Sequence, residues 1–576
     1  MREDLKSPWV VLALVLGWRF LLLVLTQQPI PGNDAFLFDG AVVNRLLYGQ
    51  YVNPSLAECF PISGHQVFAA YPPVYQGLLL PWMSVFGTSA LSAMWFHFLW
   101  SCVAGVLVVK VLIRAWGWKG DAGASNLSAP SAAGASGSAN VESFAGAAGR
   151  TAWLGLAVLF LFAITFDDRP EGLAHVFGLI ALLLTVRKPA GQGTAMALGK
   201  RRLLAGADVV LALFCSLYTS LVVGALYCGV TILTRIVGWA RFRSPFPWTV
   251  ALGVVTLFSL TTFWIAQAHP LWWQGFLENA RQTPVSTKGF RLPEPVEVIK
   301  VVRNAPVFLV AFLFVPWMWR SLLPSSKGAE KENALHSNTP APQHPNTPAD
   351  HHAPAFWGPA LTVAVSIAGW LLLAGCLLLF TANYVSYLWY VQVLLAGGLT
   401  GAASALLPRD GRSLTVVMTC FVVLVSVRAL GLTTWGALCA TDVSYQRAQR
   451  LVHNELQPLV RTGARPVVSS AFLYEAARTG VRGAIHTDWP YDRRGVPAGS
   501  DLALMNRLRP AKLVLTQFDY YRVYAPLVHE FGRHPELCSV EVRNMAKIPA
   551  PDASRALQRV LQHVSWAPVI VDFQWK

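Results

Sequence analysis

The chain has 576 residues, of which 54% are hydrophobic and only 13% are charged, with a mean hydropathy of +0.44. A soluble protein of this length would carry roughly 25% charged residues. The composition therefore excludes an ordinary soluble enzyme and predicts a polytopic α-helical membrane protein. The formal net charge of +16 does not indicate nucleic-acid binding, because much of the excess lies in short loops between apolar segments, where Lys and Arg set membrane orientation.

The first apolar segment, Trp9–Thr26, is long enough to cross a hydrocarbon core. No small-residue cleavage site follows it, so we interpret it as a retained signal-anchor helix. Arg2 and Lys6 precede it, and basic residues beside a first span predict a cytoplasmic N-terminus. Residues 27–90 then form the first extracytoplasmic loop.

A second apolar segment, Val74–Phe86, is short and contains Pro81. If it crossed the membrane, the basic loop 187–202 would fall on the outside, against the positive-inside rule. We therefore expect an interfacial helix that lies on the outer face of the membrane.

The remaining predicted spans bring the total to about eleven. They are Leu91–Ile113, Thr151–Phe166, Gly172–Val186, Leu203–Leu217, Leu221–Ile236, Trp248–Ala268, Ala305–Leu323, Phe356–Phe380, Val385–Leu407 and Ser413–Trp435. Two low-complexity segments, 117–149 and 324–355, are predicted to be cytoplasmic linkers, since their composition cannot build a core. Compact loops and such linkers fit a bacterial inner membrane.

Residues 439–576 follow the last predicted span and are expected outside the membrane, whereas residues 1–438 form the transmembrane module. Within residues 439–576, short apolar runs alternate with amphipathic helical stretches, a pattern that predicts a small α/β domain. The runs are Pro466–Ser470, Lys512–Thr516 and Ala567–Val571, and the helical stretches are Val443–Val460 and Asp552–His563.

The eight cysteines contain no Cys-x-x-Cys pair and no metal-ligand spacing. Most lie in apolar spans and are expected to be core residues. Cys59, Cys439 and Cys538 would lie outside the membrane, and whether any of them pair is left open.

Charged residues gather in the predicted outer loops. An acidic residue beside a membrane span is costly and is therefore a candidate for function. A carboxylate at this boundary can deprotonate an acceptor hydroxyl, while nearby cations bind a lipid-linked phosphate. The candidates are Asp34 and Asp39 in the first loop, Asp168, Arg169 and Glu171 in the second, and His269, Lys288 and Arg291 in a long outer loop, 269–303.

Several short motifs occur in a specific order. They are Asn33-Asp34-Ala35, Leu46-Leu47-Tyr48-Gly49-Gln50-Tyr51, Tyr71-Pro72-Pro73-Val74-Tyr75 before a short helix that ends in Phe86-Gly87, and Asp168-Arg169-Pro170-Glu171-Gly172. With the span count and the C-terminal α/β domain, they resemble the GT-C superfamily of membrane glycosyltransferases. That group includes protein O-mannosyltransferases and the aminoarabinose transferases of lipid A. The resemblance covers essentially the whole chain.

The resemblance implies a polyprenyl-phosphate-sugar donor, an inverting transfer and a first-loop aspartate as catalytic base, which Asp34 matches. Some relatives carry Lys or His directly before the proline, where this chain has Tyr71 and Pro72. Many also have a basic residue where this chain has Tyr218-Thr219-Ser220. The phosphate ligand is therefore not carried over.

Arg169, Lys288 and Arg291 are chosen as phosphate ligands by charge and side only. Tyr384 lies at the outer end of a predicted span, where relatives carry substrate-contacting residues. A place in an interfacial aromatic belt is its alternative.

Structural alternatives remain for the aspartates of the first loop. Asp34 could simply cap the helix that follows it, because Asp is a favoured N-cap residue. Asp39 is five residues further along the same helix and points away from the Asp34 face. A solvated position or a pair with Arg45 is its alternative.

The second and third outer loops have alternatives as well. Asp168 and Glu171 have the spacing of a capping box, with Pro170 in the first turn. Asp167 and Asp168 offer two carboxylates to a divalent cation, as in the oligosaccharyltransferase branch, and metal dependence is left open. His269 stands before Pro270, where a structural role is common.

The sequence therefore predicts an integral membrane glycosyltransferase, here a hexosyltransferase, with Asp34 as general base and Asp168 as a second catalytic residue. Its partners would be a polyprenyl-phosphate sugar, a glycan, lipid or protein acceptor and the bilayer, with no nucleic acid. The alternatives are a non-enzymatic lipid-glycan transporter or flippase and a cell-envelope scaffold. A transporter would need charges near mid-span and paired broken helices, which the pattern lacks.

Overall fold

The structure is a computed structural model. It describes residues 8–28, 30–32, 34–116, 169–185, 195–216, 248–282, 294–304, 367–368, 371, 375, 378, 431, 434–438, 443–487, 501–546 and 565–576. Asp167, Asp168, Lys288, Arg291, Tyr384, Cys439, both predicted linkers and the stretch Asp552–His563 lie outside these residues, as do several predicted spans.

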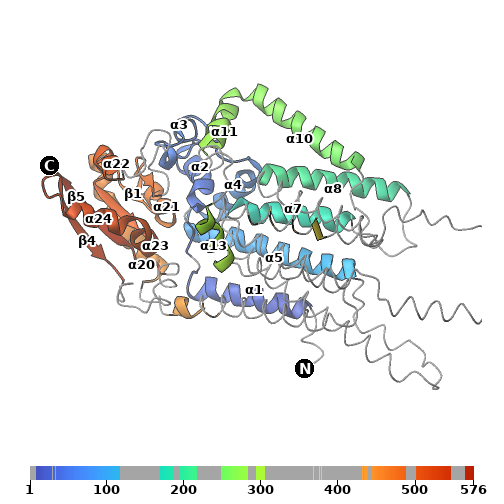
Figure 1. Cartoon of the computed structure of the whole chain (residues 1–576), viewed down its shortest axis with the longest axis horizontal. Helices are drawn as coiled ribbons and strands as arrows, with labels where there is room; N and C mark the ends of the chain where they lie inside the picture. The colour runs from blue at the N-terminus through green and yellow to red at the C-terminus, as the bar shows by residue number, and fades with distance from the viewer. Residues whose placement is uncertain are drawn as a thin grey trace, which may run out of the picture.

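Long helices lie side by side along one part of the molecule (Figure 1). α1 packs against α5, α5 against α7, α7 against α8, and α8 against α10. Their apolar sequences and lengths match the predicted spans closely. The helices are α1 (Pro8–Leu25), α5 (Ala90–Trp116), α7 (Pro170–Thr185), α8 (Ala195–Cys215) and α10 (Trp248–Ala268).

One boundary differs from the prediction. α8 begins at Ala195, eight residues before the predicted Leu203. The basic residues Lys200, Arg201 and Arg202 thus lie within the helix instead of in a loop. Lys and Arg are good helix formers, so a basic cluster that the sequence analysis assigned to a loop does not end the helix.

Two pieces of the described chain satisfy a length and hydropathy test for crossing a membrane. One is Ala90–Lys110 of α5, whose apolar window is 56% buried among other helices. The other is a pair, Leu252–Ala268 and Pro270–Asn279, which passes together and is bent by 114°. The total of about eleven spans stays a prediction.

The bend starts at Pro270, whose ring favours the first turn of a new helix and hinders continuation of the previous one. α11 (Pro270–Gln282) and α13 (Pro295–Asn304) occupy much of what the sequence suggested was an outer loop. α11 packs on α3 (Pro61–His65) of the first loop, where Glu278 accepts a hydrogen bond from the Ile62 amide at 3.4 Å.

The first loop is largely helical. α2 (Ala35–Tyr48) ends at Gly49, which adopts φ 78° in the left-handed region that glycine tolerates. The 3₁₀ turn η2 (Pro54–Leu56) and α3 follow. α4 (Val74–Phe86) has the predicted bounds and packs on α2 and α5. Its location at a membrane interface remains a prediction.

The C-terminal unit, residues 443–487, 501–546 and 565–576, is an α/β fold at one end of the helices (Figure 1). Its sheet has the order β2-β1-β3-β5-β4, with β2, β1 and β3 parallel and β5 antiparallel to both β3 and β4. The strands are β1 (Val467–Val468), β2 (Ile485–His486), β3 (Lys512–Leu515), β4 (Cys538–Asn544) and β5 (Val569–Trp575).

Helices of the C-terminal unit cover this sheet. α20 precedes β1, α21 connects β1 to β2, and α22 precedes β3. The short α23 continues into the π-helical turn η5 and then α24. Their bounds are α20 (Tyr445–Thr462), α21 (Ser470–Thr479), α22 (Asp501–Leu508), α23 (Gln517–Asp519), η5 (Tyr520–Tyr524) and α24 (Ala525–Gly532).

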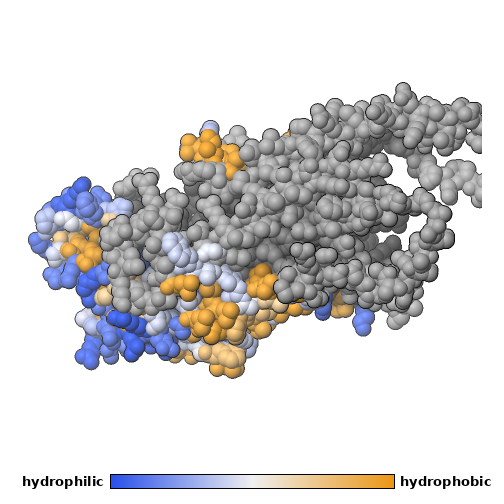
Figure 2. Space-filling model, turned by 90° about the horizontal axis from the view of Figure 1, so that it is seen from below, coloured by the Kyte–Doolittle hydropathy of each residue, from blue (hydrophilic) through white to orange (hydrophobic). Residues whose placement is uncertain are grey.

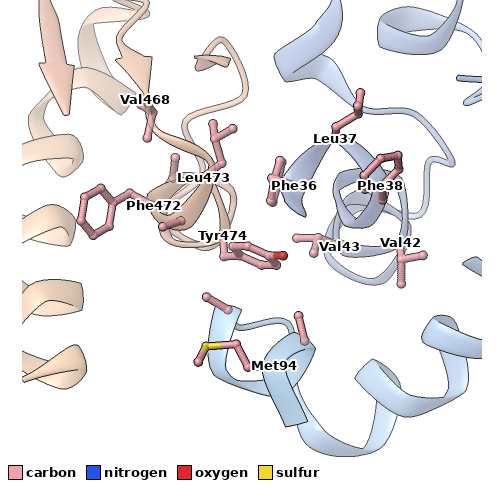
Figure 3. Close-up of a cluster of buried hydrophobic side chains, with 14 of the residues drawn as sticks. Phe36, Leu37, Phe38, Val42, Val43, Met94, Val468, Phe472, Leu473 and Tyr474 are labelled. Atoms are coloured by element: carbon pink, nitrogen blue, oxygen red, sulfur yellow. The ribbon is translucent and has the colours of Figure 1, made fainter. Parts of the chain in front are cut away.

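One hydrophobic core joins the first loop, α5 and the C-terminal unit. Figure 3 shows Tyr474 of α21 lying between α21 and α2, close to Phe36 and Val43, with Met94 of α5 below. Figure 2 shows mostly hydrophilic residues on the exposed part of the C-terminal unit and hydrophobic residues on the neighbouring helical part. The C-terminal unit thus shares its core with the first loop.

Cys59 and Cys538 are buried free cysteines.

Candidate active site

Asp34 and Arg169 meet where α2 and α7 begin. Nη1 of Arg169 lies 3.5 Å from Oδ2 of Asp34. The Asp34 side chain is 32% exposed and that of Arg169 is 19% exposed. The pair is therefore partly shielded, yet solvent still reaches the carboxylate. A carboxylate and a guanidinium from two different predicted loops are brought into one place.

Asp34 precedes α2, as expected, but its side chain makes no capping hydrogen bond. Oγ of Ser470 accepts the hydrogen bond from the Phe36 amide at 2.8 Å instead. An orphan amide at the helix N-terminus is thus satisfied from a residue 434 positions away. The capping alternative for Asp34 is wrong in this structure, and its carboxylate faces Arg169.

Aromatic rings support the Arg169 side of the site. The guanidinium carbon of Arg169 lies 5.5 Å from the centroid of the buried Phe38 ring, a cation–π contact. Phe38 packs edge-to-face on Tyr71 at 4.5 Å between centroids. The site thus joins residues of three motifs that are far apart in the sequence, those that contain Asp34, Tyr71 and Arg169.

Asp39 is fully buried. Its Oδ1 accepts a hydrogen bond from Tyr75 at 2.7 Å and its Oδ2 accepts one from Tyr474 at 2.6 Å. Arg45 instead donates to the Gly49 carbonyl. The expectation that Asp39 lies on a solvated face or pairs with Arg45 is wrong, because burial of a carboxylate requires hydrogen-bond donors and two phenols supply them. The Asp39 carboxylate is thus closed off from solvent in this structure, and its substrate-binding role stays a prediction.

The start of α7 is only partly described. Pro170 is the first residue of α7, as expected. Arg169 directly precedes the helix, and its carbonyl accepts from the Gly172 amide at 3.2 Å. A capping box with Asp168 as N-cap would start the helix one residue earlier. Glu171 lies in the first turn, and Asp168 is outside the described residues.

His269 is exposed at the bend between α10 and α11. Its carbonyl accepts from the Trp273 amide at 3.1 Å, and its ring lies edge-to-face with Trp264, 6.5 Å away. This placement favours the structural alternative for His269. Trp273 in turn stacks on Phe276 within α11.

Residues outside the sequence prediction complete the site. Ser470 and Tyr474 come from the C-terminal unit, and no local pattern in α21 marks them. Tyr75 is the last residue of the Tyr-Pro-Pro motif, so the motif did point to it. His97 of α5 lies 3.0 Å from the Tyr75 hydroxyl through Nε2. Within the described part of the chain, no three His, Cys, Asp or Glu side chains come together as a metal site.

No family model matches this chain, and no curated protein matches it in sequence. A solved structure, the crystal structure of ArnT from Cupriavidus metallidurans bound to undecaprenyl phosphate, is similar with 14% identity over 98% of each chain at a TM-score of 0.42. The inference about function starts from the contact between Asp34 and Arg169.

Proposed function

We propose that this chain is an integral membrane glycosyltransferase that moves a sugar from a polyprenyl-phosphate donor to an acceptor hydroxyl on the extracytoplasmic face. The observation that carries the proposal is the Asp34–Arg169 pair, a partly exposed carboxylate and guanidinium 3.5 Å apart at the end of apolar helices. A base and a phosphate-binding cation are the two groups that this reaction needs.

Each group has a defined role in the transfer. Asp34 takes the proton of the acceptor hydroxyl as its oxygen attacks the anomeric carbon of the donor sugar. The bond from that carbon to the phosphate oxygen breaks, and polyprenyl phosphate leaves with the electron pair. Arg169 stabilises the negative charge that develops on the leaving phosphate. Attack opposite the leaving group inverts the anomeric centre.

The apolar surroundings suit a lipid-linked donor. α10 exposes large apolar side chains, among them Leu252, Val255, Leu260 and Phe263. Such a helix is stable only against lipid or other apolar partners. A polyprenyl chain would remain in the bilayer beside these helices while its phosphate reaches Arg169. The same proposal includes a hexose as the sugar, a hydroxyl group on a glycan, lipid or protein as the acceptor, and Asp168 as a second catalytic residue.

The test is transfer from a radiolabelled polyprenyl-phosphate hexose by the purified protein in lipid. The Asp34→Asn variant is compared with Glu58→Gln, because Glu58 is another first-loop carboxylate in an ion pair, with Arg465. We expect Asp34→Asn to lower kcat by roughly 10² to 10⁴, the range for loss of a general base. Glu58→Gln should remain near wild type.

Equal activity of Asp34→Asn and wild type would show that Asp34 is not the base, and Asp168 would be tested next. Absence of wild-type turnover with several carrier-linked sugars would contradict the proposal and favour a transporter or a scaffold. A flux assay in vesicles distinguishes those two.

A further inference from the structure

Helix α21 of the C-terminal unit makes two polar contacts, one helical turn apart, with the N-terminal half of α2. Ser470 and Tyr474 are four residues apart and so lie on one face of α21. Ser470 accepts from the Phe36 amide at 2.8 Å, and the Tyr474 hydroxyl donates to Asp39 at 2.6 Å. The rings of Phe36 and Tyr474 also pack edge-to-face at 4.9 Å. The N-terminal half of α2 is thus fixed against α21.

A second set of contacts fixes α2 against α4 and α5. The Tyr75 hydroxyl of α4 donates to the other carboxylate oxygen of Asp39 and also contacts His97 of α5. Both oxygens of a fully buried carboxylate are therefore held by phenols from two different elements. Rotation of α2 would leave these polar groups buried without partners, which is costly.

These contacts decide where Asp34 points. Asp34 is five residues before Asp39 at the start of the same helix, so the orientation of α2 sets the position of the Asp34 carboxylate. Ser470 also satisfies the amide that Asp34 would otherwise cap. With that amide bound by Ser470, the Asp34 side chain makes no capping hydrogen bond and lies beside Arg169.

We propose that Ser470 and Tyr474 are positioning residues for Asp34, so that the C-terminal unit is an integral part of the active site. The proposal rests on the proposed function, with Asp34 as base. Apolar packing alone would join α2 and α21 at lower cost than a buried carboxylate. A buried polar network instead selects one arrangement of the helices, which is what an accurately placed base requires.

The test compares Tyr474→Phe with Tyr524→Phe in the full-length protein. Tyr524 is an equally buried tyrosine of the C-terminal unit, and its hydroxyl donates to the Thr487 carbonyl at 2.9 Å. Both variants lose one phenol hydroxyl and keep the ring. We expect Tyr474→Phe to lower kcat by on the order of 10-fold to 10²-fold, with KM for the donor unchanged. Tyr524→Phe should keep wild-type kcat at a similar loss of thermal stability.

Ser470→Ala gives an independent measurement. It should lower kcat as well, because Asp34 then becomes the nearest side chain that can cap α2. The combined Ser470→Ala and Tyr474→Phe variant should lose less than the product of the single effects, as expected for residues that act as a unit. Equal kcat values for Tyr474→Phe and Tyr524→Phe would overturn the proposal, as a purely structural contact predicts that result.

Hydrogen exchange tests the positioning role independently of the proposed glycosyltransferase activity. Amides at the start of α2 should exchange faster in Tyr474→Phe and Ser470→Ala than in Tyr524→Phe, whether or not any donor is turned over. Unchanged exchange there would overturn the positioning role by itself. Faster exchange together with an inactive wild type would retain the coupling of α21 to α2 and reject the glycosyltransferase.

Discussion

At the residue scale, the site depends on which side chain accepts the hydrogen bond from the amide at the N-terminus of α2. Local rules assign the cap of α2 to Asp34, since aspartate is favoured before a helix. The structure gives that task to Ser470 and leaves Asp34 beside Arg169. By its local sequence, Asp34 would be a capping residue. Its carboxylate makes no capping hydrogen bond, because Ser470 from a distant segment accepts from the amide instead.

Arg169 allows a prediction at this scale. Its guanidinium contacts both Asp34 and the Phe38 ring. Arg169→Lys keeps the charge but loses the planar group that stacks and binds phosphate in two places. A loss of about 1.4 kcal/mol corresponds to a tenfold change in binding. We therefore expect KM for the donor to rise by roughly tenfold.

Arg482→Lys is the matched control for that prediction, because Arg482 makes a similar contact, 4.4 Å from the centroid of the Tyr48 ring, at the far end of α2. Its KM should stay within about twofold of wild type. The measurement is initial rate against donor concentration. Similar KM values for the two variants would contradict a role for Arg169 in phosphate binding.

At the element scale, α2 is held by close packing and by polar contacts from the first loop. A Cβ at Gly40 would stand about 2.5 Å from Cγ of Asn53. Asn53 is fully buried and donates to the Phe36 carbonyl at 2.9 Å, so it cannot move away without losing that bond. Glycine is required at this position for close approach of the two segments.

We therefore expect Gly40→Ala to destabilise the protein by about 1–3 kcal/mol, the usual cost of overpacking. Gly77→Ala is the control, since a Cβ at Gly77 in α4 meets no atom within 4 Å. That change should be neutral or slightly stabilising, because alanine favours helix more than glycine does. Thermal unfolding in detergent measures both, and equal melting temperatures would refute the packing argument.

A charged cluster joins α20 to the sheet of the C-terminal unit. Both terminal nitrogens of Arg543 donate to Glu455 at 2.8 Å, and Arg543 also donates to Asp572 at 2.7 Å. Lys512 contacts the same two carboxylates. The hydrogen bonds from Arg543 are the main reason why the pKa of Glu455 lies below its ordinary value of 4.5.

A carboxyl group with a lowered pKa in the folded state stabilises the fold above its unfolded-state pKa, and this is lost as pH falls through the folded-state value. Glu455→Gln should therefore lower the free energy of unfolding near neutral pH, by about 1 kcal/mol or less given solvent screening. The difference from wild type should shrink as pH falls below 4.5. Thermal unfolding over a pH series checks this.

Glu530→Gln serves as the control for the charged cluster, because Glu530 is exposed on α24 of the same unit. Its difference from wild type should be small at every pH. A Glu455→Gln difference that stays constant into the acid range would contradict an ion-pair origin and point to packing.

At the scale of the whole molecule, the C-terminal unit contacts the end of α1 and the first loop. The buried Trp566 donates to the Gln27 carbonyl at 3.0 Å, and its ring lies 4.7 Å from that of Tyr445. Burial raises the pKa of Tyr445 to about 12. Glu58 of the first loop and Arg465 of the C-terminal unit also form an ion pair.

Trp566→Ala should cost about 3–5 kcal/mol, the usual range for a buried aromatic residue replaced by alanine. It should also make the C-terminal unit more sensitive to proteolysis, because its contact with the end of α1 is lost. Trp264→Ala is the comparison, as Trp264 is 64% exposed on α10 and should be nearly neutral. Equal protease sensitivity of both variants would contradict the role of Trp566.

The sequence by itself determined the long apolar helices. Apolar length predicted α1, α5, α7 and α10 within a few residues, and Pro81 with its short apolar run predicted α4. These features are local, since burial of backbone groups and hydrophobic periodicity act over neighbouring turns. Asp34 and Arg169 were also chosen from the sequence, by their position beside spans and by their motifs.

Only the tertiary structure decided which residues meet. Asp39 is buried because Tyr75 and Tyr474 lie on two other elements that close over it. Asp34 lies beside Arg169, while Ser470, 436 residues further along the chain, satisfies the helix amide. Hydrogen bonds and close packing between distant segments leave no periodic trace in a sequence, since their partners are set by the fold and not by spacing along the chain.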